Sequence, residues 1–169
     1  MQLYPLFFNF TSEITGPTFK TKVTTEGRVL VEVFNEEWWI NGVNPGSMAG
    51  GGPDLPSAWA KFRQSFNEIL VDFAEEVPNH EAFEAKVNEF LADVDTEEAR
   101  RWEEAREAMR QGGSVDKSLS RMKVIKDGMP FRLTFSRTED RVAPVPKRAT
   151  VGATSEFPMA ADEQLELAA

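Results

Sequence analysis

Acidic side chains are the most frequent groups in this chain that could perform acid–base chemistry, and several stand in adjacent pairs. The pairs are Glu36 with Glu37, Glu75 with Glu76, Glu97 with Glu98, and Glu103 with Glu104. General acid–base catalysis needs two groups that converge on one substrate. Neighbouring residues on a helix point about 100° apart, so such pairs do not converge without tertiary help. We therefore expect these carboxylates to lie on solvated faces.

Other residue types limit the chemistry further. The 169 residues include no cysteine and a single histidine, His80. Disulfides, thiolate metal sites and cysteine nucleophiles are thereby excluded, and a multi-histidine metal site or a histidine-based triad has no support. His80 follows Pro78 and Asn79 and is expected to be a surface or capping residue. We predict a protein that is not an enzyme and that has no catalytic residues, no metal and no cofactor.

A glycine run, Gly50 to Gly52, precedes the predicted helix start at Asp54. Backbone amides before a helix can bind phosphate. No Lys-Ser/Thr pair follows the run, however, and the Asp54 carboxylate takes the place that a phosphate would occupy. Because glycine and proline interrupt regular structure, we interpret 46–53 as a flexible connector between a strand and a helix. Whether a small ligand binds near Gly50–Gly52 stays open.

Two adjacent tryptophans lie at the start of an extended run, 38–43. Strand alternation places Trp38 on one face and Trp39 on the other. If one face belongs to the core, the second ring must be covered by a loop, a helix or another subunit. Tryptophan is also enriched among the anchors of protein interfaces. Core packing and a partner contact are both open interpretations of this pair.

Charge is distributed unevenly along a chain whose net charge is -9. Residues 68–104 carry 13 acidic and 3 basic side chains, 117–148 carry 9 basic and 3 acidic ones, and 149–169 carry 4 acidic and no basic ones. The basic segment could contact nucleic-acid phosphates, or it could dock on the acidic helices of its own chain or of a partner. The candidate nucleic-acid contacts are Lys123, Lys126, Arg132 and Arg137.

The elements that must position these residues follow from periodicity. Alternation predicts strands at 3–10, 19–24, 29–34 and 38–43, with turns at 16–17, 26–27 and 35–37. Apolar residues at spacings of three and four predict a helix over 54–77, capped by Asp54, and two shorter helices at 80–92 and 95–111. The segments 122–126 and 131–135 predict a hairpin. From residue 143 on, prolines and weak periodicity predict a mostly disordered tail.

These elements predict an α+β fold. An antiparallel meander of about four to six strands is covered on one face by the long amphipathic helix, with two further helices beside it, a C-terminal hairpin and a disordered tail. We expect one domain over 1–142, with acidic helices at 80–111 and a basic hairpin at 117–142, and a disordered acidic tail at 143–169. The N-terminus lacks the basic region of a signal peptide, and no membrane span is evident, so the cytoplasm is the expected location.

The last three residues, Leu167-Ala168-Ala169, look like the C-terminal tags that AAA+ proteases recognise. A neutral, tolerant chain end is the competing interpretation. Whether this end is a degradation signal stays open.

A family resemblance is carried by the central stretch. Its parts are the strand end Gly42-Val43-Asn44-Pro45-Gly46, the small residues Ala49-Gly50-Gly51-Gly52, and the helix start Asp54-Leu55-Pro56-Ser57-Ala58. Over about 18–77 the chain resembles the HicB-like antitoxin domain, whose core is strand-strand-strand-helix-strand. The family's usual Pro-Asp is not reproduced at Val43-Asn44, and no ribbon-helix-helix or helix-turn-helix module follows.

The resemblance implies an intracellular protein that binds and masks a small toxin ribonuclease, often as an oligomer, and that often represses its own promoter. Our leading hypothesis is accordingly a non-enzymatic interaction protein that binds a small basic protein. The candidate partner contacts are Trp38, Trp39, Met48, Glu97 and Glu104. Self-association stays open. The alternative, from another class, is a nucleic-acid-binding module that uses 117–148.

Overall fold

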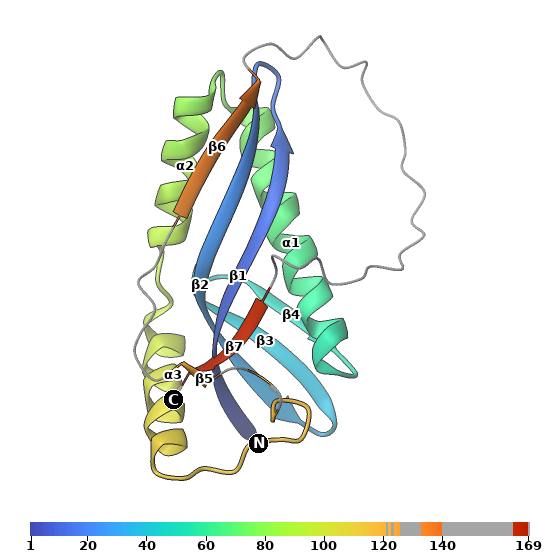
Figure 1. Cartoon of the computed structure of the whole chain (residues 1–169), viewed down its shortest axis with the longest axis vertical. Coiled ribbons are helices and arrows are strands. Elements are labelled where there is room, and N and C mark those ends of the chain that lie inside the picture. The colour runs from blue at the N-terminus through green and yellow to red at the C-terminus, as the bar shows by residue number, and fades with distance from the viewer. Residues whose placement is uncertain (121, 123, 126–132, 140–163, 169) are drawn as a thin grey trace.

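The computed structural model describes residues 1–120, 122, 124–125, 133–139 and 164–168. The strands are β1 (Gln2–Thr15), β2 (Lys20–Phe34), β3 (Glu37–Asn44), β4 (Ala49–Gly52), β5 (Val124–Ile125), β6 (Leu133–Glu139) and β7 (Gln164–Ala168), and the helices are α1 (Leu55–Glu76), α2 (His80–Ala92) and α3 (Thr96–Arg110). One sheet has the strand order β4-β3-β2-β1-β7-β5, with β6 also paired to β2 (Figure 1). The predicted α+β class and the antiparallel meander are confirmed.

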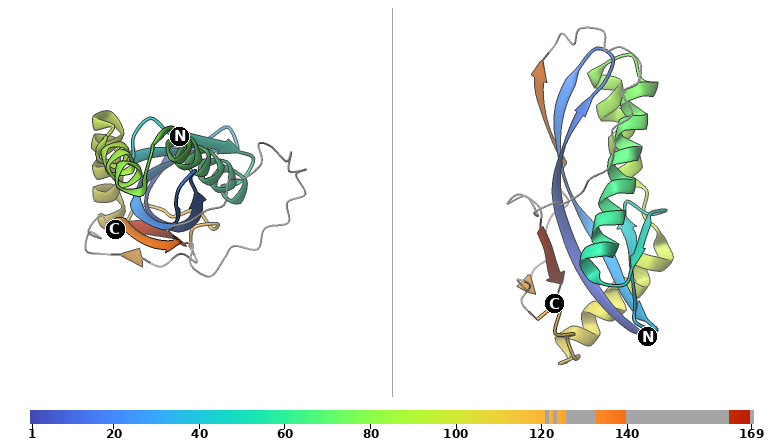
Figure 2. Two further views of the ribbon diagram at one scale, coloured as in Figure 1. Left: turned by 90° about the horizontal axis from the view of Figure 1, so that it is seen from above. Right: turned by 90° about the vertical axis from the view of Figure 1, so that its right-hand side faces the viewer.

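The two longest strands, β1 and β2, form an elongated twisted hairpin (Figure 2). The sequence predicts a turn at 26–27, which is wrong, because β2 runs through it without a break. Gly27 lies opposite Phe8 in the ladder, and a Cβ atom at Gly27 would lie 2.6 Å from the Phe8 ring and 2.2 Å from the carbonyl oxygen of Asn44. Glycine therefore stands here because of a close approach, not because of a turn.

The glycine run is a strand rather than the predicted flexible connector. Residues Ala49–Gly52 pair antiparallel with β3, and Gly50 lies against α1. A Cβ atom at Gly50 would lie 2.5 Å from the backbone nitrogen of Phe62. The missing side chain lets the helix backbone rest directly on β4, and this contact explains why glycine occupies the strand.

The three helices begin at the residues that the sequence predicts. The Asp54 carboxylate accepts a hydrogen bond from the Ser57 backbone N–H at 2.8 Å, and Asp95 accepts bonds from two backbone N–H groups of the first turn of α3 at 3.0 Å. Asn79 caps α2 in the same way. The hydrogen bond from Ser57 lowers the pKa of Asp54. Within the described ranges, no helix is long and apolar enough to cross a membrane.

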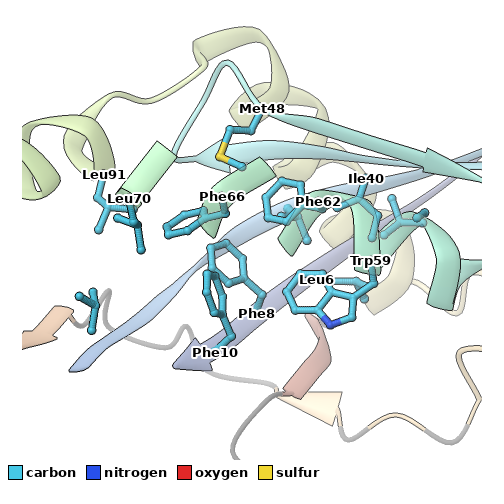
Figure 3. Close-up of a cluster of buried hydrophobic side chains, with 14 of the residues drawn as sticks. Leu6, Phe8, Phe10, Ile40, Met48, Trp59, Phe62, Phe66, Leu70 and Leu91 are labelled. Atoms are coloured by element: carbon cyan, nitrogen blue, oxygen red, sulfur yellow. The ribbon is translucent and has the colours of Figure 1, made fainter. Parts of the chain in front are cut away.

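The helices cover both faces of the sheet. Trp59, Phe62 and Phe66 of α1 pack on Phe8 and Phe10 of β1, all nearly inaccessible to solvent (Figure 3). α2 lies beside α1 and joins the same cluster. α3 instead packs on the opposite face, which the sequence pattern did not predict.

The contact that holds α3 is a ring cluster centred on Trp102. Its indole lies 5.3 Å from the Phe7 ring and donates a hydrogen bond to the Leu6 carbonyl at 3.3 Å. Leu30, Val43, Ala105 and Ala168 belong to the same cluster. Because Phe7 lies between Leu6 and Phe8 on β1, its ring points away from α1, and this alternation separates the two cores.

The C-terminal predictions need correction where the structure describes them. The strands expected to form a hairpin have different partners, since β5 pairs with β7 and β6 pairs with β2. The tail predicted to be disordered contains β7, which pairs with β1, so Leu167 and Ala168 are buried instead of forming a free chain end. The rest of that prediction, for 143–163 and Ala169, lies outside the described residues.

Candidate functional site

The two adjacent tryptophans have different environments. Trp38 is 8% exposed and belongs to the core under α1, whereas Trp39 is 44% exposed on the opposite face of β3. Met48 is buried in the same core as Trp38. The prediction that Trp38 and Met48 contact a partner is therefore not supported by their placement, because α1 covers the face to which they point. Trp39 remains accessible.

Around Trp39 the structure gathers side chains that the sequence analysis did not select. Phe34 is 56% exposed and Met1 is 75% exposed. Together with Glu32 and Asn41 they line a shallow hollow beside the Trp39 ring. We call these five residues, Met1, Glu32, Phe34, Trp39 and Asn41, the Trp39 surface.

The β2–β3 turn explains how this surface is assembled. Asn35 and Glu36 have φ angles of 52° and 65°, which is the arrangement of a two-residue hairpin turn with two left-handed residues. This turn sets the register, so Glu32 lies opposite Trp39 and Phe34 opposite Glu37. The turn itself was predicted correctly. The register that follows from it places Phe34 and Trp39 on one face, beyond the end of the α3 cover.

Glu32 marks the border between the covered and uncovered parts of this face. Its carboxylate accepts a hydrogen bond from Arg101 of α3 at 3.2 Å and one from the Asn41 side chain at 3.4 Å. Burial acts to lower the pKa of Arg101, but its hydrogen bonds with Glu98 and Glu32 outweigh burial and raise that pKa. Glu32 is thus held in place by a charged group that stays protonated.

A second hollow runs along β4, on the other side of Trp39. The Trp39 ring lies over Gly51, where a Cβ atom would come within 2.9 Å of it. The wall opposite the ring belongs to α1. The charged and polar residues that line this hollow are Glu36, Glu37, Lys61, Gln64, Ser65 and Glu68. Three carboxylates therefore face a single lysine in the lining.

Glu97 and Glu104, the acidic partner contacts predicted from sequence, lie elsewhere. Both carboxylates pair with the Arg100 guanidinium on the exposed surface of α3. The hydrogen bond from Arg100 lowers the pKa of Glu97. Neither residue lines either hollow beside Trp39. The acidic groups that the fold brings to Trp39 come from β2, the hairpin turn and α1 instead.

His80 is buried rather than a surface or capping residue. Its Nε2 lies 3.1 Å from the Thr21 hydroxyl, and its Nδ1 lies 3.5 Å from the Glu84 carboxylate. The rings of Phe19 and Phe135 pack on it at 5.4 and 6.1 Å. Thr21 has no exposed surface and His80 is only 6% exposed, so the imidazole lies in the core. The cluster holds α2 against β2 and β6.

The predicted nucleic-acid contacts cannot be placed as a group. Lys123, Lys126 and Arg132 lie outside the described residues, and Arg137 lies in β6 opposite Thr21. In the described part of the chain, no group of three metal-binding side chains is arranged to hold an ion. Comparisons with protein-family models, with curated proteins and with solved structures found no match.

One sequence signal could have found the missed residues. Strand alternation puts Phe34 on the same face of β2 as Glu32. Near both ends of the strand, this face carries mainly polar residues. Apolar side chains that gather into one exposed patch mark interaction sites, whereas a single exposed ring does not. Pairing this observation with the two-residue turn would have placed Phe34 next to Trp39. The contribution of Met1 and Glu68 depends on tertiary packing and had no local signal.

Proposed function

We propose that this protein is a non-enzymatic, cytoplasmic interaction protein that binds a small basic protein through the Trp39 surface. The observation that carries the proposal is the exposure of two large aromatic residues, 44% for Trp39 and 56% for Phe34, at diagonal positions of the paired strands β2 and β3 on one face of the sheet. Buried aromatic anchors surrounded by a polar rim are typical of protein interfaces. Trp39 and Phe34 are residues of the kind that anchor interfaces, and no described residue buries them.

The charge around these rings supports a basic partner. Glu36, Glu37 and Glu68 line the hollow along β4, where Lys61 is the opposing charge. An acidic rim steers a basic protein toward the aromatic centre and speeds association at low salt. The HicB-like resemblance of 18–77 leads to the same class of partner, a small toxin ribonuclease.

The test is affinity purification from the cells that make this protein, with the tagged chain as bait. We expect a small basic protein to be retained at a stoichiometric level by the wild type and by Val94→Ala, and to be lost with Trp39→Ala. Val94 is a matched control because it is also an exposed apolar residue, 36% accessible, between α2 and α3. Retention by Trp39→Ala would contradict the proposal, as would recovery of the bait without a partner.

A nuclease-treated sample separates this proposal from the alternative that 117–148 binds nucleic acid. A protein partner that survives nuclease supports the interaction protein. Recovery of nucleic acid alone, with binding that weakens steeply as salt rises, would move the function to the basic segment.

A further inference from the structure

The strand β4 lies at the end of the strand order, and no other described strand pairs with its outer side. The backbone groups on its inner side pair with β3. The Gly42 N–H donates to the Met48 carbonyl at 2.8 Å, and the register continues through Ile40 opposite Gly50. Because bonded and non-bonded pairs alternate in an antiparallel ladder, the N–H and C=O groups of Ala49 and Gly51 point outward.

The outer side of β4 has a wall on each face. On one face the Trp39 ring lies across Gly51, and on the other face α1 rests on Gly50. The α1 residues that line the hollow at this edge are Lys61, Gln64, Ser65 and Glu68. Since the three glycines have no side chains, the backbone itself forms the floor between the two walls. The edge is therefore a slot with hydrogen-bonding groups along its base.

We infer that the basic partner adds an extended strand to the outer edge of β4, with its backbone bonded to Ala49 and Gly51. This inference rests on the proposed function and specifies how the partner binds. Strand addition to an open edge supplies affinity through main-chain hydrogen bonds and specificity through alternate side chains. It also joins the two hollows that meet at Trp39 into one binding surface.

The walls define the chemistry of the added strand. Alternate side chains of that strand face Trp39 on one side and the polar surface of α1 on the other. An arginine facing Trp39 stacks on the indole and lies near Glu36 and Glu37, so it gains both a cation–π contact and opposite charge. The occupant is thus a segment with arginine at alternate positions, and not an acidic or a purely apolar one.

Synthetic peptides test this binding mode directly. The probe is an eight-residue peptide, blocked at both ends, in which arginine alternates with valine. Two variants carry N-methyl groups on the odd-numbered or on the even-numbered amides. We expect the parent peptide to bind the full-length chain, and one methylated variant to bind at least about tenfold more weakly than the other, because only one set of amides bonds to β4.

A substitution in the protein gives the complementary measurement. Ala49→Pro removes an outward N–H from an edge strand, where proline is tolerated because the bond to β3 is not involved. We expect peptide binding to fall by about tenfold with Ala49→Pro and to be unchanged with Val94→Ala. Circular dichroism confirms that both variants are folded. If Ala49→Pro does not fold, the two methylated peptides with the wild-type chain still decide the question.

Several outcomes would overturn strand addition. They are absence of peptide binding to the wild type, equal binding of the two methylated peptides, and full binding by folded Ala49→Pro. A dimer in sedimentation that Ala49→Pro dissociates would also overturn it, because the occupant would then be a second copy of the chain. If Ala49→Pro still captures the cellular partner while Trp39→Ala does not, the inference fails and the proposed function stands. If the wild type captures no basic protein, the proposed function itself fails.

Discussion

The two faces of the sheet carry aromatic rings from the same strands, but only one face buries all of them. Under α1, the Phe66 ring packs edge to face on the rings of Phe8 and Phe10, at centroid distances of 6.2 and 4.8 Å, and each of the three residues is at most 2% exposed. On the opposite face, α3 covers Phe7 with Trp102, and the cover ends before Phe34 and Trp39.

The difference shows that strand alternation alone does not decide which rings belong to the core. Trp38 and Trp39 are adjacent residues of the same type, and they differ in solvent exposure because α1 covers Trp38 whereas α3 does not cover Trp39. A ring that stays exposed contributes little to the free energy of unfolding. Stability therefore does not explain the two exposed rings, and for this reason we propose that this face is a binding surface.

The largest effect that separates the two faces is expected for Phe66→Ala. Phe66 has no exposed surface and contacts the rings of Phe8, Phe10 and Phe90. Its truncation leaves a cavity between α1 and the sheet and should lower the free energy of unfolding by about 3 to 5 kcal/mol. Urea denaturation followed by tryptophan fluorescence measures this change. A loss below about 1 kcal/mol would mean that α1 is not packed on the sheet as described.

An intermediate effect is expected for Gly50→Ala. The added Cβ atom would lie 2.5 Å from the Phe62 nitrogen and 2.6 Å from the Ala58 carbonyl oxygen, so α1 must move away from β4. Overpacking of this kind costs about 1 to 3 kcal/mol, again measurable by urea denaturation. The exposed neighbour provides the control, since Ala49→Gly changes only backbone entropy and should cost less than about 1 kcal/mol. Equal losses from the two substitutions would argue against the close helix–strand contact.

The sequence predicts well those features whose causes are local. The α1 helix follows from apolar residues such as Trp59, Phe62 and Phe66 at spacings of three and four, together with the Asp54 cap, and the structure confirms it. The β2–β3 turn was also local. The glycines were misinterpreted because their causes are tertiary. Gly27 makes room for the Phe8 ring and Gly50 for the α1 backbone, and neither neighbour is visible in the surrounding residues.

The predictions for the C-terminal strand and for the candidate site were wrong for a related reason. Long-range contacts determine both features. Leu167 pairs with β1 at the other end of the chain, so a locally weak pattern becomes a strand. At the site, alternation predicts that Trp38 and Trp39 face opposite ways, but both faces carry large rings. To choose the exposed tryptophan, one must know that α3 packs on the second face of the sheet and that the area it covers ends near Glu32.

The smallest effect on stability, and the sharpest contrast with Phe66, is expected for Phe34→Ala. The chemical change is the same, but Phe34 is already 56% exposed to solvent. The free energy of unfolding should therefore change by less than about 1 kcal/mol, as is usual for surface substitutions. Capture of the basic partner should nevertheless fall, because Phe34 lines the same hollow as Trp39. A variant that is as stable as the wild type yet deficient in binding would establish that this face is kept for contact. A large loss of stability would instead show that Phe34 is covered in solution, and the two faces would no longer differ.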